Sequence, residues 1–159
     1  TPALFEKYKT LDDYCSADVR DIEKIIYSCG FYKSKAKSII DMAKGVRERF
    51  GGIVPDSIDD LITLNGVGRK TANLIVGDIY HKQAIVVDTH MIRITNRIGL
   101  VCEKDPKKIE FALKKLIPAE ESSDFCNRIV LFGRDTCPAR KPKCDVCPMD
   151  FNCKKIGVK

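Results

Sequence analysis

The 159-residue chain contains no tryptophan, only two histidines and no apolar run long enough to cross a membrane. Its ten glycines and seven prolines are scattered, which excludes collagen-like and low-complexity proteins. Near the first residue there is no basic segment followed by an apolar one, which is the pattern of a secretory signal. We therefore expect a cytoplasmic or nucleoid protein, or a nuclear protein in a eukaryote.

Positive charge is in excess and is unevenly distributed. The net charge is +6, and residues 134–159 contain seven Lys or Arg against three Asp. A solvated surface would explain this excess, and so would a polyanionic partner such as nucleic acid.

Four of the eight cysteines lie close together near the C-terminus. Six, two and five residues separate Cys137, Cys144, Cys147 and Cys153. Without a secretory signal, clustered cysteines bind a metal more often than they form disulfides. Four thiolates at this spacing can bind one Zn²⁺ or a [4Fe–4S] cluster, and the spacing alone leaves both open.

Apolar residues recur with a helical period almost throughout the chain, so we expect an all-α protein. The expected helices run over about 19–29 with a stop at Gly30, 36–50, 57–64, 69–80, 88–97, 105–117 and 121–132 with a stop at Gly133. Residues 84–87, AIVV, are strand-like in content but are expected to form a buried connector. The segment TPALFEKYKTL reads as the end of a helix, which suggests a piece of a larger protein.

The stretch LNGVGRKTAN, at residues 64–73, predicts two helices joined by a glycine turn. Glycine at positions 66 and 68 permits positive φ and a close backbone approach. We expect the backbone N–H groups of Val67, Gly68 and Arg69 to form an anion site with the helix N-terminus.

Lys70 falls in the first turn of the expected helix, beside Arg69, where positive charge is unfavourable. Nearby positive potential favours the neutral form of a lysine amine, and that form is the nucleophile. The unfavourable position is therefore consistent with an activated lysine.

Three motifs in order now resemble a known family: LNGVGRKTAN, then VVDTH with its Asp eighteen residues after Lys70, then the four-cysteine loop. Together they resemble the endonuclease III family of the helix-hairpin-helix, Gly-Pro-Asp superfamily of base-excision DNA glycosylases. The resemblance runs from about Thr1 to about Cys153. It implies a helix-hairpin-helix DNA glycosylase fold, with a helical bundle and a helical [4Fe–4S] cluster subdomain.

The resemblance also implies the domains and the site. Residues 1–98 would form the helical-barrel domain with its hairpin at about 57–80, and residues 99–159 the cluster subdomain with its loop at 137–153. Lys70 matches the nucleophile, Asp88 the catalytic aspartate, and the four cysteines the cluster ligands. The expected DNA-binding residues are Gly66, Val67, Gly68, Arg69, Thr71, His90, Arg140, Lys141 and Lys143.

The implied function is removal of oxidised pyrimidines from double-stranded DNA and cleavage of the strand 3′ to the abasic site by β-elimination. Family members normally carry about fifty further residues with N-terminal helices, so we expect a removed segment or a separate chain to supply them. The alternatives are a non-catalytic DNA-binding module, a zinc-ribbon adaptor and, within the family, a mismatch-specific glycosylase. Lys70 favours the strand-cleaving type, because mismatch glycosylases generally lack a lysine there.

Overall fold

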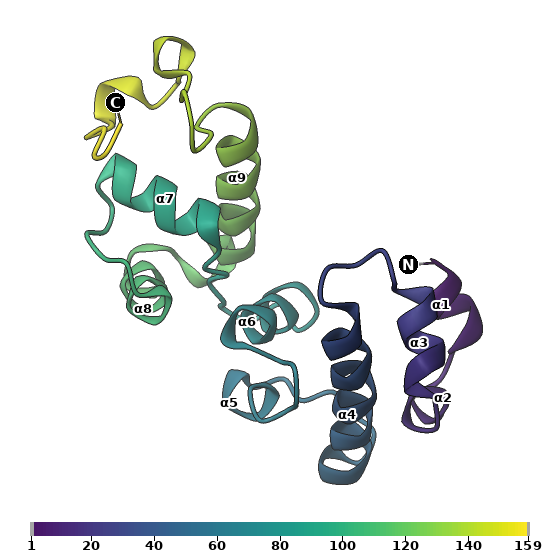
Figure 1. Cartoon of the computed structure of the whole chain (residues 1–159). Coiled ribbons are helices and arrows are strands. Elements are labelled where there is room, and N and C mark those ends of the chain that lie inside the picture. Colours follow the sequence, from purple (N-terminus) through teal and green to yellow (C-terminus); the bar gives the residue numbers. More distant parts are fainter. Residues whose placement is uncertain (1, 159) are drawn as a thin grey trace. The chain divides into compact units, whose positions relative to one another are not determined.

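A computed structural model describes residues 2–158, and every regular element in that range is a helix (Figure 1). This confirms the all-α prediction. Among these residues no helix has both the length and the apolar character needed to cross a bilayer. By packing, the chain divides into two units, Thr1–Ala72 and Asn73–Lys159, and each is described separately.

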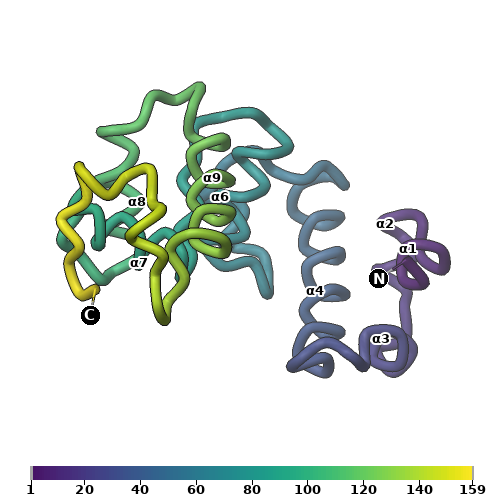
Figure 2. Tube along the Cα trace, turned by 90° about the horizontal axis from the view of Figure 1, so that it is seen from above, coloured from purple at the N-terminus to yellow at the C-terminus, as the bar shows by residue number. Residues whose placement is uncertain are grey.

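The first unit contains five helices and the start of a sixth. They are α1 (Pro2–Lys7), α2 (Leu11–Cys15), α3 (Val19–Ile25), α4 (Tyr32–Phe50), α5 (Ile58–Leu61) and α6 (Arg69–Asp78). Helices α2 and α3 pack along α4 (Figure 2). One cluster of buried side chains in this unit consists of Leu4, Tyr8, Ile22, Ile26, Ala36 and Ile40.

Helix ends in this unit follow the local chemistry. Thr10 and Asp13 form a reciprocal capping box at the start of α2, and Ser57 caps α5 as predicted. Helix α4 ends at Gly51, whose φ of 61° lies in the left-handed region that glycine adopts without strain.

The predicted helix end at Gly30 is wrong. Helix α3 stops at Ile25, and a turn follows in which the Cys29 N–H donates to the Ile26 carbonyl at 2.8 Å. Ile26 and Cys29 still pack in or against the core from this turn. The apolar spacing therefore reflects burial here, not continued helix.

The second unit is built on α7 (Thr89–Ile98), α8 (Pro106–Leu116) and α9 (Ser122–Asp135), with α7 packed on α9. Asp88 and Asp105 cap α7 and α8 as predicted, because their carboxylates accept from the N–H groups of Met91 and Lys108, each at 2.8 Å. Short 3₁₀ turns cover Ala119–Glu121, Cys144–Val146 and Asp150–Asn152. The core includes Ile85, Met91, Ile94, Ile109 and Leu113, all at most 1% exposed.

Gly133 does not end the last helix, contrary to the prediction, because α9 continues to Asp135. A Cβ on Gly133 would lie 2.5 Å from His90 Nδ1 and 2.7 Å from Ile94 Cδ1. Glycine is therefore present where α7 approaches α9, and close packing is its role here.

The packing boundary between Ala72 and Asn73 lies earlier in the chain than the boundary predicted from the motifs, at 98/99. The contacts between residues define the two compact units, whereas the predicted boundary separates the hairpin motif from the cysteine loop. The division into a helical-barrel domain and a cluster subdomain stays a prediction.

Candidate functional site

The predicted hairpin is formed by α5, a turn and the start of α6. The Val67 N–H donates to the Leu64 carbonyl at 3.1 Å, and Gly66 has a φ of 78°. A Cβ at Gly66 would lie 2.5 Å from Cβ of Ser38 on α4, so both the φ angle and the space require glycine. Val67 is buried and its N–H serves the turn, so one of the three expected anion donors is already used.

Gly68 differs from the expectation for it. It is not among the glycines with positive φ, and a Cβ built on it would have no neighbour within 4 Å. The surface above this backbone is therefore open, which suits the close approach of a ligand outside the chain.

Helix α4 holds the hairpin in place from one side. Arg49 donates from Nη1 to the Thr63 carbonyl at 3.1 Å and from Nη2 to Thr63 Oγ1 at 2.7 Å. Asn65 donates to Asp41 Oδ2 at 2.7 Å. These bonds fix the turn relative to the longest helix of the unit.

Lys70 is the second residue of α6, and its side chain is exposed. Arg69 opens the helix and is half-buried, and Thr71 is exposed. The structure therefore confirms that both cations lie in the first turn, at the positive end of the helix dipole.

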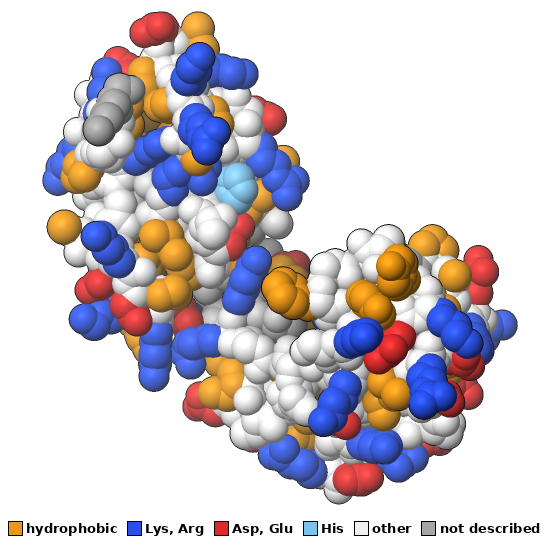
Figure 3. All heavy atoms as spheres, viewed as in Figure 1, with side chains coloured by type: hydrophobic (Ala, Val, Ile, Leu, Met, Phe, Trp, Pro, Cys, Tyr) orange, Lys and Arg blue, Asp and Glu red, His pale blue; other side chains and the backbone are white. Residues whose placement is uncertain are grey.

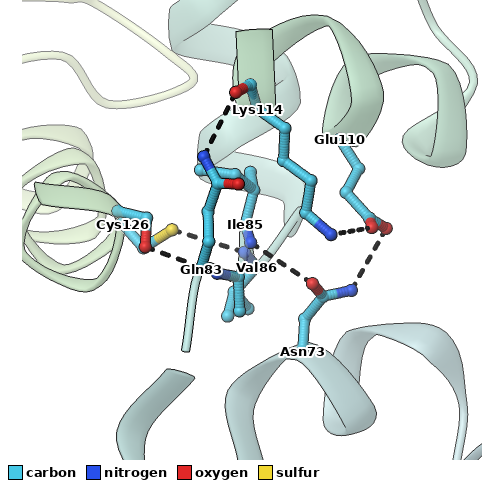
Figure 4. Close-up of polar contacts among 9 residues, drawn as sticks. Asn73, Gln83, Ile85, Val86, Glu110, Lys114 and Cys126 are labelled. Atoms are coloured by element: carbon cyan, nitrogen blue, oxygen red, sulfur yellow. Dashed lines mark hydrogen bonds and ion pairs between the residues drawn. The ribbon is translucent and has the colours of Figure 1, made fainter. Parts of the chain in front are cut away.

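Asp88 follows an extended connector that has no partner strand among the described residues. The backbone N–H groups of Ala84, Ile85 and Val86 donate instead to side chains, at 3.2 to 3.3 Å. The acceptors are Ser122 Oγ, Asn73 Oδ1 and Cys126 Sγ. Figure 4 shows Asn73 and Cys126 beside the connector. A buried donor without a partner costs about 1–3 kcal/mol, so these side chains are what allow the connector to be buried.

Cys126 accepts the N–H of Val86 as a neutral thiol. Burial raises the pKa of this thiol, which keeps its proton on sulfur near neutral pH. Cys126 therefore has a packing role beside the connector.

His90 lies in the first turn of α7, half-buried against α9. Arg93 Nη2 lies 3.1 Å from His90 Nδ1 and donates to the carbonyls of Gly133 and Cys137, each at 3.0 Å. A guanidinium only donates, so the contact with Nδ1 is a hydrogen bond only in a tautomer whose Nδ1 is an acceptor. The two carbonyl bonds tie Arg93, beside His90, to the end of α9 and to the first cysteine of the loop.

The four predicted ligands are brought together: Cys137, Cys144, Cys147 and Cys153 all line one cavity of the second unit. Two of the sulfurs already receive N–H donors. The backbone of Lys155 donates to Cys153 Sγ at 3.4 Å, and Arg97 Nη1 donates to Cys137 Sγ at 3.2 Å. Hydrogen bonds of this kind orient sulfur ligands toward a metal centre.

The loop between Cys137 and Cys144 presents three cations. Arg140, Lys141 and Lys143 are all exposed. Lys141 has a φ of 52°, an unusual value for a residue other than glycine. In the second unit, Lys and Arg side chains gather on the surface over α7 and the C-terminal segment (Figure 3). The predicted basic loop is thus available to solvent.

Sequence reasoning missed two buried polar residues that support these groups. Arg97 is 8% exposed and Asn73 is 1% exposed. The one available signal in the sequence was that each of these polar residues falls on the apolar face of its helix.

Comparison with known proteins places the chain among DNA-repair enzymes. The sequence profile of HhH-GPD superfamily base excision DNA repair proteins matches residues 1–119. The chain is 39% identical over 151 residues to endonuclease III of Thermotoga maritima, which covers 95% of this chain and 71% of the relative.

Two solved structures have the same fold. A trapped endonuclease III–DNA covalent intermediate aligns with a TM-score of 0.90 at 38% identity, over 96% of this chain and 72% of that one. A thermostable thymine-DNA glycosylase aligns with a TM-score of 0.84 at 27% identity, over 97% of this chain and 73% of that one. The chain belongs to the HhH-GPD superfamily of base excision DNA repair proteins, and it is a DNA glycosylase of the endonuclease III type.

Proposed function

We propose that the chain is a bifunctional DNA glycosylase and AP lyase that removes oxidised pyrimidines from double-stranded DNA. It would then cut the strand 3′ to the abasic site by β-elimination. The observation that carries the proposal is Lys70, an exposed lysine in the first turn of α6 directly after a glycine hairpin. Similarity to a trapped covalent endonuclease III–DNA intermediate supports a covalent route.

In this proposal Lys70 is the nucleophile. Its neutral amine attacks C1′ of the flipped nucleotide, a C1′–N bond to lysine forms, and the bond from C1′ to the base breaks. Ring opening gives a Schiff base between Lys70 and C1′. Loss of a proton from C2′ then breaks the bond between C3′ and its phosphate oxygen, which cuts the strand on the 3′ side.

In this proposal Asp88 is the carboxylate that assists the reaction of Lys70 with the sugar. Its N-cap position holds the carboxylate rigidly, because one oxygen accepts from Met91 N. A fixed carboxylate can accept the proton of Lys70 or stabilise the positive charge that develops on the sugar.

The DNA backbone would be held at two places. Gly66 allows the tight turn, Gly68 and the start of α6 offer backbone N–H groups to a phosphate, and the space above Gly68 is open. Arg140, Lys141 and Lys143 offer cations on a loop fixed by cysteines at both ends. Similarity to DNA-bound endonuclease III supports this arrangement, and a DNA substrate would place the protein in the bacterial nucleoid, or in the nucleus of a eukaryote.

The four cysteines share one cavity and would hold a [4Fe–4S] cluster, as the resemblance to the endonuclease III family implies. A single zinc ion is the alternative that the same four thiolates allow. A cluster divides its thiolates among four irons, and when bound it would order the basic loop.

An apolar cavity in the first unit supports the proposal that further helices complete this domain. It has a volume of about 570 Å³, opens beside Gly66 and is lined by apolar side chains of Leu4, Ile26, Ile39 and Met42. Helices from another segment or from a separate chain would bury these side chains and remove them from water.

Trapping with borohydride tests the function. Borohydride reduces a Schiff base to a stable amine, so the chain should become covalently attached to a duplex with one abasic site. Lys70→Gln should abolish attachment and strand cleavage while DNA affinity is kept. Lys107→Gln is the matched control, because Lys107 is also exposed and is the second residue of its helix, α8.

The outcomes separate the candidates. Undiminished trapping in Lys70→Gln would refute the assignment of Lys70 as the nucleophile. DNA binding with no trapping of the native chain would favour a non-catalytic module, and one zinc per chain without visible absorption would favour a zinc-ribbon adaptor. Excision of a mismatched thymine without strand cleavage would favour a mismatch-specific glycosylase, which the similarity to a thymine-DNA glycosylase brings into the comparison.

A further inference from the structure

A buried amide of α6 bonds the connector that leads to Asp88. Asn73 is 1% exposed and joins two other parts of the second unit. Its Nδ2 donates to Glu110 Oε2 on α8 at 3.1 Å, and its Oδ1 accepts the backbone N–H of Ile85 at 3.2 Å (Figure 4).

The orientation of this amide is fixed by charge. Lys114 donates to Glu110 Oε1 at 2.9 Å, and an ammonium group can only donate. Glu110 therefore accepts on both oxygens, and it must face the NH₂ group of Asn73. The amide oxygen is left to face Ile85, so an aspartate at position 73 would place two carboxylates together.

The connector depends on this bond because it has no partner strand in the described part of the chain. Ile85 lies three residues before Asp88, and the neighbouring N–H groups of Ala84 and Val86 are held from α9. Asn73 supplies the bond from α6, and it follows Lys70 by three residues on that helix. One helix therefore carries the proposed nucleophile and, a turn later, the side chain that holds the segment ending at the proposed catalytic aspartate.

We propose that Asn73 is a positioning residue for Asp88 in base excision, an inference that rests on the function proposed above. It acts through the backbone of Ile85 and does not touch the substrate. Buried Glu110 and half-buried Lys114 form the charged pair that keeps the amide oxygen of Asn73 directed at the connector. Small displacements of a catalytic group can cost about 10²-fold in rate, so removal of this bond should slow the chemical step.

The first test measures single-turnover excision of an oxidised pyrimidine as a function of enzyme concentration. Asn73→Ala should lower the maximal rate constant by about 10- to 100-fold and leave the half-saturating concentration within about twofold. The matched control is Asn96→Ala. Asn96 also bridges two elements of this unit, by donating to the carbonyls of Ile92 and Glu103 and accepting from Glu103 N. It should lower thermal stability but keep the maximal rate constant of the folded protein.

A charge swap keeps the proposal testable if Asn73→Ala does not fold. Asn73→Asp alone should reduce activity, because its carboxylate would face that of Glu110. Adding Glu110→Gln exchanges the amide and the carboxylate, which can retain all three hydrogen bonds and keeps one negative charge in the network, now on residue 73 instead of on residue 110. This double variant should recover most of the rate, and no recovery would contradict the proposal.

A double-mutant cycle with Asp88→Asn separates positioning from general destabilisation. If Asn73 acts through Asp88, adding Asn73→Ala to Asp88→Asn should cause little further decrease in rate. Three results would overturn the role of Asn73 while leaving the proposed function intact. They are rate decreases that multiply in the double variant, a raised half-saturating concentration for Asn73→Ala, and an equal decrease in the rate constant of Asn96→Ala. A fully active Asp88→Asn variant would overturn the proposed role of Asp88 and this inference with it.

Discussion

The Arg97 guanidinium donates from Nη1 to Cys137 Sγ at 3.2 Å, which joins α7 to the first cysteine of the loop. The same group donates to the carbonyls of Pro138 and Ala139 at 2.8 and 2.9 Å. The Arg97 carbonyl accepts from Ile156 N at 3.1 Å, just beyond the last cysteine. One buried residue therefore holds both ends of the loop.

Replacing Arg97 by lysine should weaken retention of the proposed cluster. Lysine keeps the charge but cannot reproduce the planar fork of three bonds. Partners of metal ligands typically contribute 10- to 100-fold to affinity, so bleaching of visible absorbance under a chelator should be about 10-fold faster. Iron content should fall from about four per chain. Arg128→Lys, on the exposed face of α9, is the control, and equal bleaching rates in the two variants would contradict a role for Arg97.

Asp88→Asn should separate catalysis from capping. Asparagine is as good an N-cap as aspartate, so the free energy of unfolding should change by less than about 1 kcal/mol. Excision per folded molecule should fall by about 10²-fold or more, because the charge is removed. Thermal melting and single-turnover rates measure the two effects. A large drop in stability with full activity per folded molecule would instead make Asp88 only structural.

Gly133→Ala should destabilise the second unit although alanine favours helix. The helix propensity gain is about 1 kcal/mol, whereas overpacking against His90 and Ile94 costs about 1–3 kcal/mol. The melting temperature should fall by a few degrees. Gly30→Ala is the control, because its Cβ would have no neighbour within 4 Å and its φ is not positive. A higher melting temperature for Gly133→Ala would show that α7 and α9 are not tightly packed there.

The sequence correctly predicted several helix ends, which depend on short-range interactions. The caps at Ser57, Asp88 and Asp105 and the first turn of α6 were predictable because each depends on a few neighbouring residues. The role of Gly133 was not predictable from the sequence, because a glycine can either end a helix or allow a second helix to pack closely. Only the approach of α7 shows that Gly133 has the second role.

The candidate site divides in the same way. Lys70 and the cysteines could be identified from their motifs, because each motif is contiguous or closely spaced in the sequence. Asn73 and Arg97 could not be assigned roles, because the partners of their side chains lie 12 to 42 residues away in the chain. Long-range hydrogen bonds of this kind become visible only when the helices are packed.

The basic loop gives the last prediction, on DNA binding. Arg140→Ala, Lys141→Asn and Lys143→Ala should be combined, with asparagine chosen because it tolerates the left-handed backbone at position 141. Removing one cation–phosphate interaction reduces the slope of log K against log salt by about 0.9 for duplex DNA. The control replaces Lys104, Lys107 and Lys115, three exposed lysines at or near α8, and removes the same net charge. If the loop binds phosphate, the first variant binds every duplex more weakly and has a flatter salt slope, while the control keeps the native slope. Equal slopes in all three proteins would mean that the loop is only a solvated surface.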